Sequence, residues 1–235
     1  MKVALITAFN NDFDKNLAEV FAREDYKVYV MGNVKQNGIT AIPTEIKEAA
    51  ALVKKDSGFI DVYIDVTNEN DLSDNFNART GINEQVIHDL YEANVTRPMA
   101  MLEAFLPLLE AGGGKRLCYL TSAAASINET RDIDGLGYKM AKAALHNFLQ
   151  ITRNALAPKG YTIRAFDPCL AGTSGEREVS APISAPLTAP LTAPQSAMAA
   201  FNYFTRRRGM ERDDPNRDDE GNLVFRDAWG RQHSW

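Results

Sequence analysis

Two residues in an alanine-rich stretch have the types and the spacing needed for proton transfer. Tyr138 and Lys142 lie four positions apart in a segment, residues 137–145, that favours a helix. Residues four apart share one face of a helix, so the phenol and the ammonium group are expected to be neighbours. A nearby cation favours the phenolate and lowers a tyrosine pKa that is about 10 when unperturbed. The spacing predicts a tyrosine that exchanges protons near neutral pH, although solvent-exposed helices also show this spacing.

The segments around this pair alternate between short apolar, β-branched runs and amphipathic helical stretches. This alternation predicts parallel β-α-β units, and strands that are apolar on both faces predict helices on both sides of the sheet. Right-handed connections then give an α/β fold, a Rossmann-like doubly wound parallel sheet in one domain of residues 1–235. The predicted strands are 2–7, 27–31, 60–66, 116–121 and 161–166, and the predicted helices are 17–24, 44–55, 83–110, 137–156 and 195–207.

Ligands of such sheets bind beyond the carboxyl ends of the strands, so the residues that follow Thr7, Val66, Thr121 and Phe166 are candidates for a site. After the last predicted strand, residues 171–194 are rich in Gly, Ser, Thr, Ala and Pro. Frequent proline excludes a continuous helix or a central strand there. A long irregular segment at this place is typical of a lid over a pocket, and a plain flexible linker is the alternative. We expect a substrate lid at about 170–205 and a C-terminal tail at about 209–235.

The bulk composition is that of a soluble globular protein. The 235 residues are 45% hydrophobic and 24% charged, with a net charge of -5, and the isoelectric point is near 5.3. An acidic chain lacks the basic footprint of nucleic-acid binding, and no apolar run reaches the roughly 20 residues of a membrane span. The first residues read as a buried strand and lack the features of a signal peptide. We therefore expect a cytoplasmic protein whose partners are neither nucleic acids nor membranes.

The cysteines and histidines do not form a metal-binding pattern. Cys118 lies in an apolar, strand-like run and Cys169 follows a proline, so structural roles are expected for both. The histidines His88, His146 and His233 are far apart in the sequence. Because no spacing typical of zinc ligands is present, no metal site is predicted.

With the tyrosine and lysine placed on the helix after residue 121, the chain resembles the short-chain dehydrogenase/reductase family. The signature of that family is a YxxxK pair preceded by a serine at the end of the fifth strand, here Tyr138, Lys142 and Ser122. The family also uses an asparagine in the preceding helix, and Asn94 matches its position. The resemblance implies that Ser122 binds the substrate carbonyl and that Tyr138 transfers the proton. It also implies that Lys142 lowers the phenol pKa and holds the nicotinamide ribose, and that Asn94 anchors a water.

Further points of resemblance cover most of the chain. Pro168 stands at the family's usual Pro-Gly pair, and Thr173 stands where a threonine often touches the nicotinamide carboxamide. Residues 225–235 resemble the aromatic, Trp-terminated tail of C-factor-like members. The implied activity is that of an NAD(P)-dependent oxidoreductase, which interconverts a small-molecule carbonyl and an alcohol by hydride transfer. Family members usually pair through the helices that carry Asn94 and Tyr138, which implies a homodimer or homotetramer.

The dinucleotide half of the pattern is altered. The family's TGxxxGxG fingerprint allows a tight turn beside a pyrophosphate at a helix N-terminus, but Ala8, Asp12 and Asp14 replace its glycines. Two carboxylates repel a diphosphate by on the order of 1 kcal/mol each when solvated. The Asn-Asn-Ala-Gly element is replaced by residues 65–68. NADP or NAD is the implied cofactor, and the residues expected to line its site are Thr7, Ala8, Phe9, Asn10, Asp12, Phe13, Asn33, Asp65, Val66, Lys142, Pro168 and Thr173.

Three hypotheses follow from an intact catalytic half and an altered dinucleotide half. The first is an NAD(P)-dependent carbonyl reductase or alcohol dehydrogenase with a divergent loop. The second is a nucleotide-poor relative that acts as a signalling or regulatory binding protein. The third is a non-redox lyase, dehydratase or isomerase that keeps Tyr138 and Ser122 for proton transfer. Dinucleotide binding, reductase turnover and turnover without nicotinamide distinguish them. We favour the first hypothesis, and the apolar, small-residue lid suggests an uncharged carbonyl substrate.

Overall fold

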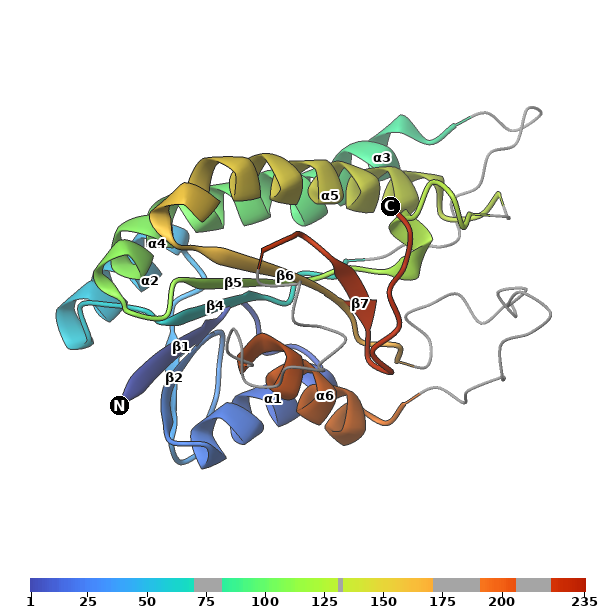
Figure 1. Cartoon of the computed structure of the whole chain (residues 1–235). Helices are drawn as coiled ribbons and strands as arrows, with labels where there is room; N and C mark the ends of the chain where they lie inside the picture. The colour runs from blue at the N-terminus through green and yellow to red at the C-terminus, as the bar shows by residue number, and fades with distance from the viewer. Residues whose placement is uncertain (70–81, 131–132, 171–190, 206–220) are drawn as a thin grey trace.

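A single parallel sheet organises the computed structural model, which describes residues 1–69, 82–130, 133–170, 191–205 and 221–235 (Figure 1). Seven strands follow the order β3-β2-β1-β4-β5-β6-β7, and every neighbouring pair is parallel. The predicted doubly wound α/β fold is confirmed. The strands are β1 (Lys2–Ile6), β2 (Tyr26–Met31), β3 (Ile39–Ile42), β4 (Val62–Asp65), β5 (Arg116–Leu120), β6 (Thr162–Asp167) and β7 (Phe225–Asp227).

Helices cover both faces of this sheet and bury a separate core on each (Figure 1). Phe13 of α1 and Phe204 of α6 belong to one core, and Phe105 of α4 and Leu149 of α5 belong to the other. Burying one such side chain contributes about 1.5–3 kcal/mol, so the helices are held to the sheet mainly by apolar contact. The helices are α1 (Asp12–Arg23), α2 (Ile46–Asp56), α3 (Glu84–Tyr91), α4 (Arg97–Ala111), α5 (Leu136–Leu156) and α6 (Ala193–Thr205).

Both edge strands of the sheet are absent from the sequence prediction. The four-residue β3 pairs with β2, and the three-residue β7 pairs with β6 inside the segment that was expected to be only a tail. Runs this short carry too little periodicity to be recognised, and they become strands because a neighbouring edge offers hydrogen-bond partners. The first helix also begins at Asp12 instead of residue 17, because the Asn11 side chain caps it by accepting the N–H of Asp14.

The helix predicted over residues 83–110 is present as one uninterrupted helical stretch from Glu84 to Ala111, and it contains a π-helical turn, η1 (Glu92–Thr96), between α3 and α4 that the sequence did not predict. Pro98 has no N–H and so cannot make the usual helical bond to the carbonyl of Asn94. The Asn94 side chain adds to the distortion, since its Nδ2 donates to the Leu90 carbonyl at 3.0 Å. Such π turns often occur at functional sites, and this one carries a predicted catalytic residue.

One glycine lets α3 and α5 approach each other. A Cβ atom at Gly137 would lie 3.1 Å from the Ile87 Cα and 3.1 Å from the Leu90 Cδ1, which is tighter than ordinary packing. The residue next to it is Tyr138, so this close helix contact helps to fix the position of the phenol.

Other predictions concern location, metals and the lid. Within the described ranges, no helix is long and apolar enough to cross a membrane, and the cytoplasmic location stays a prediction. In the same part of the chain, no three potential ligands gather as a metal site would require. Most of the predicted lid, including Thr173, lies outside the described residues, although its last part forms α6. The division of the chain into one domain with a lid also stays a prediction.

Candidate active site

The four predicted catalytic residues meet beyond the carboxyl ends of β4 and β5. Ser122 follows β5, Tyr138 and Lys142 lie in the first two turns of α5, and Asn94 lies in the π turn. Tyr138, Lys142 and Asn94 are 0% exposed, and Ser122 is 4% exposed. Buried polar side chains need partners, and these four find them mainly in the segment that leaves β4.

Three of these side chains bind three consecutive residues after β4. The Lys142 Nζ donates to the Thr67 carbonyl at 2.8 Å. The Tyr138 hydroxyl donates to the Asn68 Oδ1 at 2.7 Å. The Asn94 Nδ2 donates to the Glu69 carbonyl at 2.8 Å. The Asn68 side chain therefore accepts the hydrogen bond of the phenol. The sequence places Asn68 after β4, but nothing in its local pattern predicts a role in the site.

Ser122, the fourth predicted catalytic residue, is held by the turn that follows β5. It caps the 3-10 turn η2 (Ala123–Ala125), and its Oγ accepts the N–H of Ala124 at 3.2 Å. The Ser122 side chain also interacts with the Tyr138 phenol and lowers the pKa of that phenol. The backbone N–H of Ala123, the residue directly after Ser122, donates to the buried Asp167 carboxylate at 2.7 Å. Asp167, the last residue of β6, thus holds the start of the Ser122 loop.

The electrostatics of Tyr138 differ from the sequence prediction. Burial raises the pKa of the phenol well above its ordinary value, and the Asp167 charge acts in the same direction, against the hydrogen bonds with Ser122 and Asn68. The Lys142 Nζ is 5.8 Å from the centroid of the Tyr138 ring. The predicted lowering of the tyrosine pKa is therefore wrong for the protein alone, because desolvation of the phenol is the largest effect. The Tyr138 phenol is therefore protonated at neutral pH.

The pKa of Lys142 is lowered. Burial lowers the pKa of Lys142 to about 8, against the carboxylates of Asp65, Asp167 and Glu69, which raise it. A lysine with such a pKa exchanges its proton near neutral pH. One turn further along α5, burial and the Lys142 charge lower the pKa of His146 to about 3. This neutral imidazole hydrogen-bonds the hydroxyl of Thr121, the residue before Ser122.

In the loop expected to hold the pyrophosphate, the Asp14 carboxylate already occupies a backbone N–H group. The Asp14 Oδ2 accepts the N–H of Asn10 at 2.9 Å, and the Asn11 Oδ1 accepts the N–H of Asp14 at 2.9 Å. Asp14 is 1% exposed, and its Oδ1 has no hydrogen-bond partner among the described residues. An anion at a helix N-terminus is favourable, and here Asp14 and Asp12 supply it. These residues do not fit a pyrophosphate while Asp14 is charged.

The other predicted dinucleotide residues divide into exposed and structural positions. The Thr7 Oγ1 accepts the N–H of Val66 at 3.1 Å and so ties β1 to β4. Phe13 lies in the hydrophobic core under α1, where it contacts the sheet. Asp65 is also bonded locally, to the Tyr63 hydroxyl at 3.1 Å and the Thr67 N–H at 2.9 Å. Pro168 is buried, Ala8 and Phe9 are half-buried, and Asn10, Asp12 and Asn33 are exposed.

The catalytic end fits a nicotinamide ribose better than the α1 end fits a pyrophosphate. The Lys142 ammonium has three donors, and one of them binds Thr67. The buried Oδ1 of Asn94 has no hydrogen-bond partner in the part of the chain that the structure describes. A buried acceptor of this kind is the place where an ordered water or a ligand donor is expected.

Comparison with known proteins identifies the family. The family model for short chain dehydrogenases matches residues 2–183. The chain therefore belongs to the short chain dehydrogenase family, a family of oxidoreductases, as the residues Tyr138, Lys142, Ser122 and Asn94 predicted.

Relatives and solved structures agree with this assignment. An uncharacterized oxidoreductase of Saccharomyces cerevisiae is 25% identical over 159 residues, which cover 68% of this chain and 58% of that protein. The chain thus spans less than two thirds of the length of this relative. The fold is similar to that of carbonyl reductase Sniffer of D. melanogaster, with a TM-score of 0.72, 14% identity and coverage of 100% and 99% of the two chains. An NADPH-bound carbonyl reductase from chicken fatty liver gives a TM-score of 0.71, 15% identity and coverage of 100% and 98%.

Proposed function

We propose that this protein is an NAD(P)H-dependent reductase of uncharged carbonyl compounds, with Tyr138 as the proton donor. The observation that carries the proposal is the convergence of Tyr138, Ser122, Lys142 and Asn94 in one buried site next to Asn68. Carbonyl reduction needs a proton donor and a hydrogen-bond donor at the same oxygen, and the Ser122 side chain is near enough to the Tyr138 phenol to act on its pKa.

Tyr138, Ser122 and Lys142 have different roles in the protonation of the carbonyl oxygen. The substrate oxygen takes the place of the Asn68 Oδ1 as the acceptor of the Tyr138 hydroxyl. Ser122 donates a second hydrogen bond to the same oxygen and so stabilises the negative charge that develops there. The raised pKa of Tyr138 keeps the phenol protonated until that charge forms. Lys142, whose pKa is about 8, then returns a proton to the phenolate. In the direction of alcohol oxidation the same transfers run in reverse.

A nicotinamide dinucleotide would supply the hydride to the carbonyl carbon. Lys142 would hold the ribose hydroxyls with its remaining donors, and the unpartnered Asn94 Oδ1 would order a water beside the lysine. The α1 end accepts a pyrophosphate only when the Asp14 carboxylate is protonated or displaced from the Asn10 N–H. We propose NADPH or NADH without preference, because the exposed Asn33 after β2 offers neither the acid of an NAD site nor the arginine of an NADP site. Two proteins of similar fold, the NADPH-bound carbonyl reductase from chicken fatty liver and carbonyl reductase Sniffer, support the proposed substrate class.

Transfer of an isotope label tests the proposed reaction directly. The protein is incubated with NADPH or NADH carrying deuterium at the nicotinamide C4 and with a panel of uncharged aldehydes and ketones. We expect deuterium at the former carbonyl carbon of the alcohol product. Tyr138→Phe is expected to lower kcat by about 10² to 10⁴. Absence of NADPH and NADH binding by calorimetry, or turnover that needs no nicotinamide, would refute the proposal and favour one of the alternative hypotheses.

We also propose that the protein forms a homodimer or homotetramer through α3, α4 and α5. Large apolar side chains lie exposed on these helices, including Tyr91 at 47%, Met99 at 45%, Met140 at 52% and Ile151 at 61%. Exposed apolar residues gathered on neighbouring elements are typical of a contact with another chain. Light scattering after gel filtration tests the assembly, and Met140→Glu is expected to give monomers. A monomeric wild-type protein at micromolar concentration would contradict this proposal.

A further inference from the structure

The segment after β7 folds back and reaches the loop that follows Ser122. Beyond Asp227 the chain turns, with the Gly230 N–H donating to the Asp227 carbonyl at 2.9 Å, and it then returns beside β7, where the His233 N–H donates to the Phe225 carbonyl at 3.0 Å. At its far end the Asn128 Nδ2 donates to the Trp235 carbonyl at 2.8 Å. We call residues 228–235 the return segment. It connects the edge of the sheet with the loop of residues 122–130.

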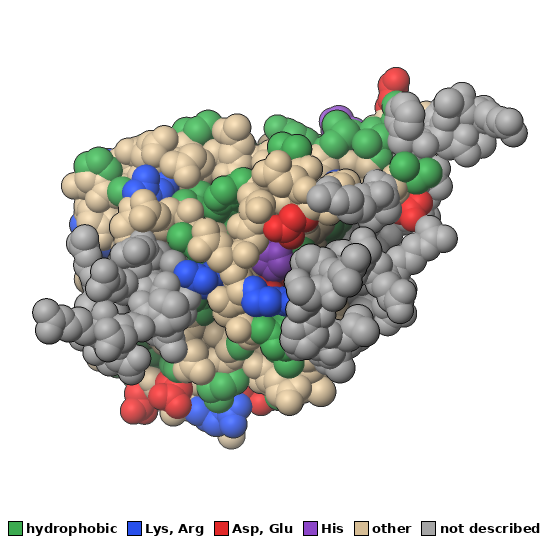
Figure 2. Space-filling model, turned by 45° about the vertical axis from the view of Figure 1, so that its right-hand side comes forward, with side chains coloured by type: hydrophobic (Ala, Val, Ile, Leu, Met, Phe, Trp, Pro, Cys, Tyr) green, Lys and Arg blue, Asp and Glu red, His purple; other side chains and the backbone are tan. Residues whose placement is uncertain are grey.

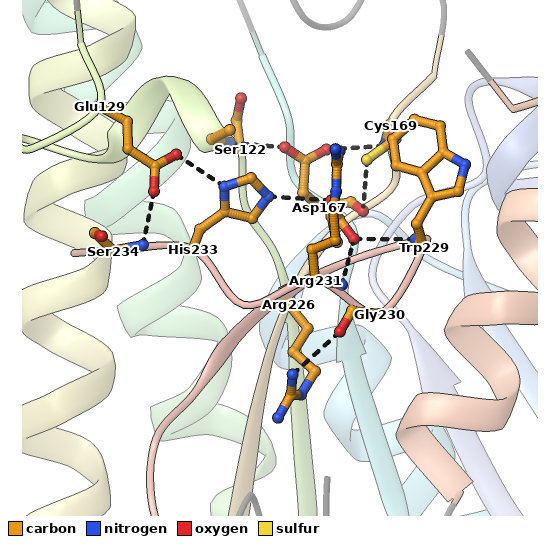
Figure 3. A network of polar contacts seen from close by, with 12 residues as sticks. Ser122, Glu129, Asp167, Cys169, Arg226, Trp229, Gly230, Arg231, His233 and Ser234 are labelled. Carbon is orange, nitrogen blue, oxygen red and sulfur yellow. Dashed lines mark hydrogen bonds and ion pairs between the residues drawn. The ribbon is translucent and has the colours of Figure 1, made fainter. Parts of the chain in front are cut away.

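His233 joins two carboxylates from different elements. Near the centre of the face in Figure 2, histidine, acidic and basic side chains lie next to one another. In the close view of Figure 3, the His233 ring points to Glu129 on one side and toward the end of β7 on the other. Its Nδ1 is 2.9 Å from the Glu129 Oε2, and its Nε2 is 3.2 Å from the Asp227 Oδ2. The Ser234 N–H adds a bond of 2.8 Å to the Glu129 Oε1.

Both ends of this bridge hold the Ser122 loop. Glu129 belongs to the far end of the loop and is anchored there, since its N–H donates to the Ser126 Oγ at 3.2 Å. Asp227 is the register partner of Asp167 in the neighbouring strand. Asp167 in turn accepts the N–H of Ala123, directly after Ser122. The bridge therefore closes a ring of contacts that runs from the start of the loop to its end.

The buried carboxylates of Asp227 and Asp167 favour a positively charged His233 between Glu129 and Asp227. Asp227 has a side chain that is 0% exposed, and Asp167 lies beside it and is also buried. Two adjacent buried carboxylates are costly unless cations compensate them. Arg231 supplies one cation, with its Nε 2.6 Å from the Asp227 Oδ2. Burial by itself lowers the pKa of His233, but its hydrogen bonds to Asp227 and Glu129 raise it to about 9. The imidazole is therefore a second cation at neutral pH.

We propose that His233 is a positioning residue of the active site, which fixes the Ser122 hydroxyl relative to the Tyr138 phenol by bridging Glu129 and Asp227. A further contact supports this role. The Trp235 ring packs edge-on against His146 at 4.8 Å between centroids, and His146 binds the Thr121 hydroxyl just before Ser122. The effect on catalysis rests on the carbonyl reduction proposed above, whereas the bridge itself does not.

The kinetic test compares two histidine variants. His233→Ala removes the bridge, and His233→Gln keeps the capacity for hydrogen bonds without the charge. The control is His88→Ala, because the His88 side chain is 76% exposed on α3. We expect His233→Ala to lower kcat about tenfold at pH 7, since a small misplacement of a catalytic group has costs of this order or larger. His233→Gln is expected to retain an intermediate kcat, and the affinity for NADPH is expected to stay unchanged. A kcat within twofold of the wild-type value in His233→Ala would overturn the proposal.

Tryptophan fluorescence tests the bridge without substrate or cofactor. Both tryptophans of the chain, Trp229 and Trp235, lie in the return segment, so their emission reports it selectively. We expect the wild-type emission to change with a midpoint at about pH 9 as His233 loses its proton, and we expect no such change in His233→Ala. The charged groups around His233 are Glu129 and Asp227, with Arg231 paired to Asp227 and Asp167 also interacting with the imidazole charge.

The two measurements separate the possible failures. A wild-type emission that stays constant between pH 8 and pH 10, or a transition that persists in His233→Ala, would overturn the ionic bridge. Absence of any NADPH turnover together with the expected fluorescence change would refute the proposed reaction and leave the bridge intact. If His233→Ala does not fold, Glu129→Gln removes the charge at one end of the bridge. It is expected to lower the midpoint of the emission change, and an unchanged midpoint would overturn the bridge.

Discussion

Replacing Asp14 with asparagine should stabilise the protein at neutral pH. Asp14 lies in the first turn of α1, is 1% exposed, and has one carboxylate oxygen without a hydrogen-bond partner among the described residues. Burial raises its pKa from 3.8 to about 6, against the lowering effect of hydrogen bonds with Asn10 and Asn11. The native state therefore holds a charged group in an environment that favours the neutral acid.

The size of the effect follows from this shift. The pKa rises by roughly two units, and each unit corresponds to about 1.4 kcal/mol, so ionised Asp14 costs the folded state about 3 kcal/mol. Below about pH 4 the carboxyl is protonated in both states and the cost is absent. The cost grows as the pH rises from about 4 to 6 and is complete above about pH 6. Asparagine keeps the oxygen that accepts the Asn10 N–H. Its side-chain amide N–H is buried without an acceptor, which costs about 1 kcal/mol of the gained stability. The expected net gain at pH 7 is about 2 kcal/mol.

Urea unfolding at pH 7 and at pH 4, followed by circular dichroism, measures this difference. Asp12→Asn is the matched control, because the Asp12 side chain lies two residues earlier in α1, is 81% exposed and pairs only at the surface with Lys15. Its substitution should change the free energy of unfolding by no more than about 0.5 kcal/mol. The gain of Asp14→Asn should disappear at pH 4. A variant that is no more stable than the wild type at pH 7, or equally stabilised at both pH values, would refute the reasoning.

Three further predictions concern Asp14 in α1 and two residues of α5, Lys142 and Gly137. Asp14→Gly should tighten NADPH binding about fivefold in calorimetry, because it removes one carboxylate whose repulsion is about 1 kcal/mol in water, and equal or weaker binding would contradict the proposed dinucleotide site. Lys142→Met should abolish carbonyl reduction and yet raise the free energy of unfolding at pH 7 by about 1–2 kcal/mol. Burial lowers the Lys142 pKa to about 8, so the unfolded chain holds that proton more tightly than the folded protein does. In urea titrations, the stability advantage of the variant should shrink above about pH 8. Gly137→Ala should destabilise the protein by about 1–3 kcal/mol, because the added methyl group would lie 3.1 Å from the Ile87 Cα, and an unchanged melting temperature would show that α3 and α5 separate easily.

Much of the fold could be predicted because local patterns determine it. Alternating apolar strands and amphipathic helices encode the parallel sheet, since side-chain periodicity states which face of each element is buried. The edge strands β3 and β7 escaped prediction because four and three residues are too few to show a period. The long helix was predicted, but the π turn within it was not, although Pro98 lies close to that turn. Its π turn depends on how Asn94 bonds to Leu90 and Glu69.

The sequence by itself determined which residues are candidates for the chemistry, and the tertiary structure decided what surrounds them. Tyr138 and Lys142 share a helix face because they are four residues apart, and Ser122 follows a strand that its apolar run defines. The Tyr138 bond to Asn68 spans 70 positions, and the His233 bridge to Glu129 spans 104. No local period encodes contacts across such separations, because the order of the strands brings them about. Burial likewise set the raised pKa of Tyr138 and Asp14, since desolvation depends on every element packed around a group.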